Sequence, residues 1–203
     1  MFERSLQKMI FSLQYTENAR LAFRDFLPRV GYAVRVRYTS SPFSDDFGQI
    51  WSFYGRTFLP GVAPHHSLLL QGVYQSQRTT LYAFRQKELF PRGADFSITP
   101  ERYVAFSADY QFPLCYPDGG ISGVLYFRRI RLNPGGDFAR YREFSRANQR
   151  VRWQNVWSYG GDITFDVVPL RMPSNTVTSI TFSVRKPSDR RGIVVGFGLS
   201  MPI

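Results

Sequence analysis

The chain has 203 residues, of which 43% are hydrophobic, so it is long enough to bury a sizeable core as one domain. Its formal net charge is +11, and arginine supplies nearly all of the positive charge. The single cysteine, Cys115, excludes an internal disulfide, and no apolar run is long enough for a membrane-spanning helix. So basic a chain suits nucleic acid, an anionic membrane surface or acidic ligands, unless its arginines are only dispersed over a solvated surface.

Alternation of apolar and polar residues predicts nine strands. We place them at residues 8–23, 30–39, 49–59, 67–77, 102–114, 121–132, 156–168, 176–185 and 192–203. The first alternates loosely, and a helix is the competing interpretation for residues 17–24. The second is more telling, because Val34 and Val36 alternate with Arg35 and Arg37. Arginines at this spacing would be costly in a dry core but suit a sheet with lipid on one face and water on the other.

The connections between these segments alternate in kind. Short breaks, often with proline, lie at 25–29, 59–66, 115–120 and 169–175, and more polar connections lie at 40–48, 78–101, 133–155 and 186–191. Short turns on one side and long loops on the other are typical of outer-membrane barrels. The strands exceed the usual five or six residues, and many aromatic residues lie near strand ends, as in interfacial girdles.

We therefore predict an all-β fold, an antiparallel transmembrane β-barrel, as a single domain over residues 1–203. In the strand at 102–114, Val104 and Phe106 are expected to face lipid, and Ser107 and Asp109 to face the lumen. In the strand at 156–168, Val167 is expected to face lipid. Arg128 breaks the parity of its strand, which places it near a strand end. Nine is an odd number for a single-chain barrel, so we expect the finished barrel to need further strands.

The connection at 78–101 contains Phe90-Pro91-Arg92-Gly93-Ala94-Asp95. A guanidinium inside a barrel is best held by carboxylates in bidentate geometry. Parity makes Asp109 the first candidate partner of Arg92, and the family resemblance described next implies Asp137 as the second. Gly93 would let the loop approach the wall closely. These four residues are the predicted lock between loop and wall.

The Arg92-Gly93 pair and the stretch Ala-Phe-Ser-Ala-Asp-Tyr-Gln-Phe-Pro-Leu at 105–114 resemble the BamA-like superfamily of bacterial surface-antigen barrels. Residues 24–29, 59–68 and 113–119 look like its Bacteroidetes members. The resemblance implies that this is the C-terminal half of a sixteen-strand barrel, whose sixth extracellular loop enters the lumen with the Arg-Gly pair. It also aligns Asp109, and more loosely Asp137, with the two acids of the family.

The same resemblance implies a function in outer-membrane protein assembly, secretion or surface anchoring, without enzymatic activity. Expected partners are outer-membrane lipid, lipopolysaccharide, client proteins and an N-terminal periplasmic module outside this chain. The last alternating residues would serve as the signal for insertion into the bacterial outer membrane; they are Phe197, Leu199, Met201 and Ile203.

The stretch at 140–153 mixes aromatic residues with Arg140, Arg142, Arg146, Arg150 and Arg152. On a surface loop these arginines would meet lipopolysaccharide phosphates; nucleic-acid binding and a merely solvated loop are the alternatives. His65 and His66 diverge as neighbours, so no metal site is expected, and no cofactor motif is found. Two other functions stay open for the chain, a small self-contained porin or adhesin and a soluble basic β-barrel that binds nucleic acid.

Overall fold

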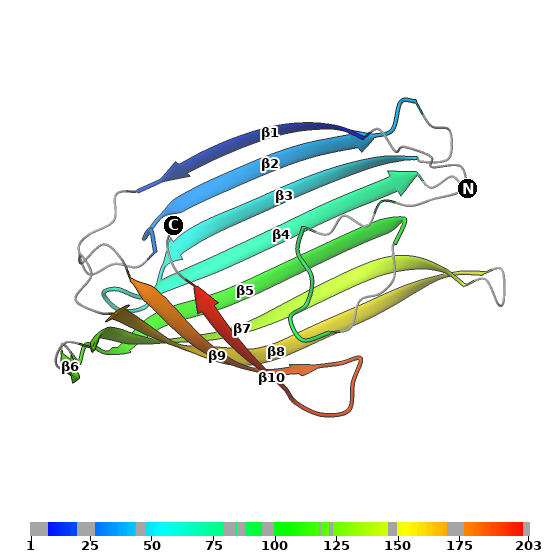
Figure 1. Cartoon of the computed structure of the whole chain (residues 1–203). Coiled ribbons are helices and arrows are strands. Elements are labelled where there is room, and N and C mark those ends of the chain that lie inside the picture. Colours follow the sequence, from blue (N-terminus) through cyan, green and yellow to red (C-terminus); the bar gives the residue numbers. More distant parts are fainter. Residues whose placement is uncertain are drawn as a thin grey trace, which may run out of the picture.

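The computed structural model describes residues 8–19, 27–43, 48–78, 84, 88–94, 100–117, 119–121, 124–145, 150–169 and 177–200. They form one antiparallel sheet of ten strands and contain no helix (Figure 1). The strands are β1 (Met9–Asn18), β2 (Gly31–Ser40), β3 (Gln49–Pro60), β4 (Ser67–Arg78), β5 (Arg102–Cys115), β6 (Gly119–Ile121), β7 (Leu125–Ser145), β8 (Arg150–Pro169), β9 (Thr178–Pro187) and β10 (Val194–Ser200). Within these residues, no helix could cross a membrane.

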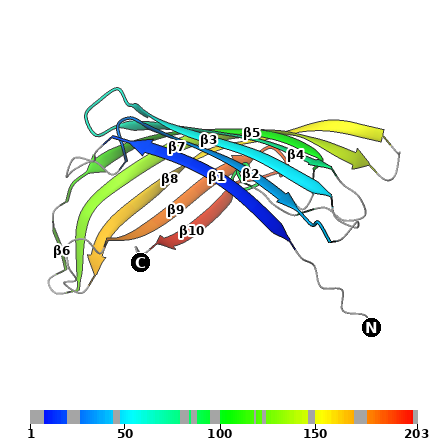
Figure 2. The same cartoon turned by 90° about the horizontal axis from the view of Figure 1, so that it is seen from above.

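Strands that follow one another in sequence are neighbours in the sheet, except that the short β6 pairs only with β7 and β5 pairs with β7. The strands β1 and β10 are the two edges, and no pairing joins them within the described residues. The sheet is therefore open. Seen from above, it is curved like a trough, with β8, β9 and β10 turned beneath the other strands (Figure 2).

The alternation in the sequence located nine of the ten strands, so the predicted all-β, antiparallel fold is confirmed. The strand interpretation of residues 8–23 is confirmed over Met9–Asn18, and residues 20–24, where a helix competed, lie outside the described residues. The short β6 was not predicted, because two of its three residues are glycine and fell within an expected turn.

The prediction of a long connection at 133–155 is wrong. The strand β7 continues to Ser145 and β8 begins at Arg150, so most of this stretch is a regular hairpin. Pro134-Gly135-Gly136 looked like a turn, since proline removes a backbone donor. The ladder between β5 and β7 is interrupted at this place, between the pairs Asp109–Gly135 and Phe112–Leu132, so the missing N–H breaks no pair with β5.

The two faces of the sheet differ in chemistry as the alternation predicts. On β5, Phe106 is 58% exposed, whereas Tyr103 is 2% exposed and Asp109 is buried on the opposite, concave face. Val167 departs from the expected parity, because it is buried instead of lying exposed on the outer face. The concave face carries an apolar cluster, against which Leu89, Phe90 and Ala94 of the loop pack; it consists of Val73, Tyr103, Ala105, Ala139, Tyr141 and Val156.

The parity break at Arg128 has a local cause. The pairing of β7 with β8 shifts register between Phe127 and Arg129, as in a β-bulge, so one residue is left over. Beyond the shift, Arg129 and Arg131 both form ion pairs with the buried Asp166 of β8. Arg128 therefore lies near the start of β7, in agreement with the predicted position near a strand end, and the register shift accounts for its break of parity.

Two alanines on opposite faces test this assignment of faces. Ala139 is fully buried on the concave face and Ala108 is exposed on the other. We expect Ala139→Leu to lower the free energy of unfolding by about 1–3 kcal/mol, because overpacking forces neighbours to shift. Ala108→Leu makes the same chemical change and should alter stability by less than about 0.5 kcal/mol. Urea unfolding measures both, and equal losses would contradict the assignment of faces.

Candidate functional site: an ion-pair network between the loop and the sheet

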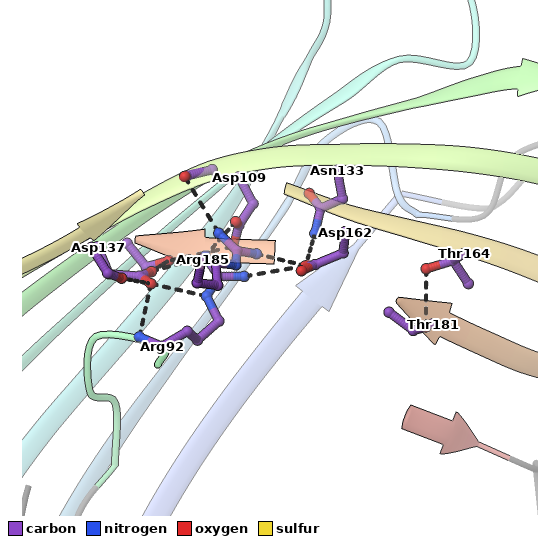
Figure 3. Close-up of polar contacts among 11 residues, drawn as sticks. Arg92, Asp109, Asn133, Asp137, Asp162, Thr164, Thr181 and Arg185 are labelled. Carbon is purple, nitrogen blue, oxygen red and sulfur yellow. Dashed lines mark hydrogen bonds and ion pairs between the residues drawn. The ribbon is translucent and has the colours of Figure 1, made fainter. Parts of the chain in front are cut away.

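Arg92 of the loop between β4 and β5 lies against three strands of the concave face (Figure 3). Its Nε donates to Oδ2 of Asp137 at 3.0 Å, and its Nη2 donates to Oδ1 of the same carboxylate at 2.8 Å. Nη2 also donates to Oδ1 of Asp109 at 2.5 Å, and the backbone N–H of Arg92 donates to Oδ2 of Asp137 at 3.0 Å. Asp137 is therefore held by both the side chain and the backbone of one loop residue.

Strand register brings the partners of Arg92 together. Ser107 of β5 is paired with Asp137 of β7, which is paired with Ser158 of β8, so three polar side chains lie in one row across the sheet. The hydroxyl of Ser107 donates to Asp137 at 2.7 Å and that of Ser158 donates at 3.0 Å. Asp109 lies two residues further along β5 on the same face. The carboxylate of Asp137 thus accepts hydrogen bonds from three different elements.

Glycines make room for this network. A side chain at Gly135, which is paired with Asp109, would place its Cβ 2.0 Å from Oδ1 of Asp109. A Cβ at Gly160 would likewise lie 2.9 Å from Cδ of Arg185, its partner on β9. Gly93 adopts φ +81°, which L side chains rarely adopt, and a Cβ there would lie 3.2 Å from Cβ of Arg185. Each glycine permits a close approach that the network requires.

The network includes a second cation and a third acid. Nη2 of Arg185 donates to Oδ2 of Asp162 at 2.6 Å, and Nη1 of Arg92 lies 3.8 Å from the same oxygen. The side chains of Asp109 and Asp137 are 6% and 3% exposed, and that of Arg92 is 35% exposed. Burial by itself would lower the pKa of Arg92, but hydrogen bonds to Asp137 and Asp109 raise it above its ordinary value. Arg92 therefore stays charged and holds the loop on the sheet by electrostatic attraction.

The structure brings all four predicted lock residues together. Asp137 makes more bonds to Arg92 than Asp109, although parity had made Asp109 the first candidate. Sequence reasoning did not assign Ser158, Asp162 or Arg185 to this network. A signal in the sequence could have pointed to them. Gly-Gly pairs at 135–136 and 160–161 interrupt the alternation of apolar residues in β7 and β8, and Gly135 and Gly160 are paired with the charged Asp109 and Arg185.

The other predicted site residues lie away from the network. Arg140 of β7 and Arg152 of β8 are exposed on strands instead of on a loop, and Arg140 lies over the ring of Trp153 at 5.1 Å. Nε of Arg142 lies 3.9 Å from Glu101. Arg150 begins β8, and Arg146 lies outside the described residues. In the predicted insertion signal, Phe197 and Leu199 are exposed on β10, and Met201 and Ile203 lie outside the described residues.

The network can hold the loop on the wall by ion pairs. Its acids are paired with arginines, which lack an acceptor and stay protonated. His66 contributes instead to the turn after β3, where its Nδ1 lies 2.8 Å from the hydroxyl of Tyr110. Within the described residues, no group of three histidine, cysteine, aspartate or glutamate side chains is arranged so that it could hold a metal ion.

Comparison with known protein families, characterised proteins and solved structures finds no match. The resemblance to the BamA-like superfamily is therefore still a prediction, which rests on the residues of the loop and of β5.

Removal of Arg92 tests the network. In Arg92→Ala, the carboxylates of Asp109 and Asp137 stay buried without their cation, so we expect the free energy of unfolding to fall by about 1–3 kcal/mol. Arg92→Lys should recover only part of the loss, because an ammonium cannot bind a carboxylate through a planar fork. Arg191→Ala, on the exposed turn before β10, removes the same charge as a control. Resistance to heat and urea on gels measures all three, and equal stability of Arg92→Ala and Arg191→Ala would refute the lock.

The glycine opposite Asp109 gives a second test. Gly135→Ala should displace the Asp109 carboxylate and lower the melting temperature, since the new Cβ would also lie 2.9 Å from the backbone oxygen of Ala108. Gly55→Ala on β3 is the matched control, because nothing lies within 4 Å of its Cβ. There we expect an unchanged or slightly higher melting temperature. If the Gly135→Ala protein had the same melting temperature as the native protein, the packing role of this glycine would be contradicted.

Proposed function

We propose that this chain forms the C-terminal part of an outer-membrane β-barrel of the BamA-like superfamily, with a function in protein assembly, secretion or surface anchoring. The observation that carries the proposal is the division of the sheet into an apolar exposed face and a charged concave face. Phe106, Phe182 and Phe197 are about half exposed or more on one face, while Asp109, Asp137 and Asp166 are buried on the other. A soluble sheet would bury the apolar face.

The dimensions of the strands support the same proposal. A tilted strand needs about 9–11 residues to cross a bilayer, and most strands here have at least ten. The aromatic residues of the outer face gather into rows across neighbouring strands. One row stacks Phe11 on Tyr38 and Tyr38 on Trp51, and another pairs Phe165, Phe182 and Phe197. The row with tyrosine and tryptophan suits the interface between lipid and water. The phenylalanine row includes Phe182 and Phe197, in the middle of β9 and β10, and would suit the acyl chains.

The loop supports membership of the superfamily. Its Arg92 lies on the concave face and contacts Asp109 and Asp137, the two acids that the resemblance aligns with those of the family. A loop segment that packs on the concave side and is tied to the wall by ion pairs makes that part of the wall rigid. We infer that it restricts passage through the barrel.

The long hairpin of β7 and β8 supports a contact with lipopolysaccharide. It continues beyond Arg142, the last residue of β7 that pairs with β5, and it projects past the neighbouring strands (Figure 1). Arg152 and Trp153 are exposed in this part of β8, and Arg140 is exposed on β7 just before it. Guanidinium groups bind phosphates through paired hydrogen bonds, and an aromatic ring beside them suits the headgroup region. The nucleic-acid alternative lacks this support, because the exposed face of the sheet is apolar rather than cationic.

Insertion into lipid tests the proposal. We expect the chain to fold in phospholipid vesicles and the fluorescence of exposed Trp51 and Trp157 to be quenched by bromine on the acyl chains, each in a single-tryptophan variant. A chain that folds as a soluble monomer without detergent, and whose tryptophans brominated lipid does not quench, would refute it.

Two adjacent residues of β9 test which face meets lipid. Phe182 is exposed on the outer face, and Ser183 is paired with the acidic Asp162. Phe182→Lys should destabilise the folded protein in vesicles by about 2–4 kcal/mol if it lies at mid-depth. Ser183→Lys should have little effect, because the ammonium would lie near Asp162. If Ser183→Lys were the more destabilising change, lipid would meet the concave face, and the proposal would be wrong.

A further inference from the structure

The loop has a second ionic contact, with the opposite sign, four residues before Arg92. The carboxylate of Glu88 accepts a hydrogen bond from Nη1 of Arg37 at 2.6 Å and lies 3.0 Å from Nη2 of Arg35. The two arginines are two residues apart on β2 and therefore share its concave face. The side chain of Glu88 is 5% exposed. One loop carboxylate is thus enclosed between two guanidiniums of the wall.

A third arginine adjoins this pair. Arg56 of β3 is paired with Ala33, which places it one diagonal step from Arg35 on the same face. Its guanidinium lies 5.6 Å from the centre of the Phe58 ring, and that of Arg35 lies 5.0 Å from the centre of the Tyr54 ring. Within the described residues, Glu88 is the acid in contact with this group. Two guanidiniums therefore bind the carboxylate of Glu88, and that of Arg56 lies beside them on the same face.

We propose that Arg35, Arg37 and Arg56 form a carboxylate-binding site on the concave face, that Glu88 is its resident occupant, and that acidic side chains of an extended polypeptide compete for it. Glu88 itself shows that the site accepts a carboxylate with normal geometry. The planar fork of arginine matches a carboxylate in two-point contacts. The three guanidiniums carry more positive charge than the single carboxylate of Glu88 neutralises. The site therefore still attracts an acidic segment that could displace Glu88, and the concave wall strengthens this attraction.

Glu88 acts as a built-in competitor. It is tethered four residues from Arg92, which is fixed on the other side of the concave face, so its effective concentration at the site is high. An external ligand must displace Glu88. Its apparent affinity is therefore its intrinsic affinity multiplied by the fraction of molecules in which Glu88 has left the site. The site and its occupant together would admit acidic segments and reject neutral ones. This inference does not depend on whether the outer face meets lipid.

Binding of a fluorescent oligoglutamate peptide to the folded full chain tests the site, with oligoglutamine as the neutral comparison. We expect Glu88→Gln to bind oligoglutamate at least about tenfold more tightly than the native chain, because the competitor is gone. Adding Arg56→Gln to Glu88→Gln should remove most of this gain. Adding Arg191→Gln instead removes the same charge from an exposed turn and should leave most of the gain.

Two results would overturn the proposal. One is equal affinity of the native and Glu88→Gln chains; the other is equal loss with Arg56→Gln and Arg191→Gln, which would mean that only the overall basic charge attracts the peptide. If Glu88→Gln does not fold, the comparison is made in the native chain. There Arg56→Gln must weaken binding more than Arg191→Gln, and equal affinities would again refute the site.

Discussion

Two carboxylates on the concave face of the sheet, those of Asp109 and Asp137, are almost completely buried and depend on a cation that the sheet does not supply at that place. Removing an ionised carboxylate from water costs several kcal/mol unless a partner and further hydrogen bonds compensate. Arg92 provides the partner from a loop, and Ser107 and Ser158 provide the additional donors. The loop must therefore hold its position if the two buried carboxylates of the wall are to keep their cationic partner.

The same principle operates with reversed sign four residues earlier in the loop, at Glu88. There the wall provides Arg35 and Arg37, and the loop provides Glu88. Between these two contacts the apolar Leu89 and Phe90 pack on the wall. The segment thus crosses the concave face from β2 to β7, fixed by charge at both ends and by apolar contact between them. The curvature of the sheet shortens this path, because strands that lie apart along the sheet approach one another across the trough.

Much of the fold followed from alternation alone, and so did part of the site. A period of two residues located nine strands and placed Asp109 on the same face as the loop. The extension of β7 was missed because Pro134 and two glycines imitate a turn, so Asp137 was placed in a loop although it lies within a strand. Glu88 was missed for another reason. It lies in a connection in which apolar and polar residues do not alternate, and its partners on β2 are far away in sequence.

The sequence by itself determined which residues of each strand share a face, because successive side chains of any extended chain point in opposite directions. It also determined that one of these faces is apolar and the other is charged. Only the tertiary structure decided which charges meet. Contacts such as Arg92 with Asp137 or Glu88 with Arg37 join residues about fifty positions apart, and they depend on strand register, on glycines that leave room and on the curvature of the whole sheet. None of these properties belongs to a single segment, so no local pattern could reveal them.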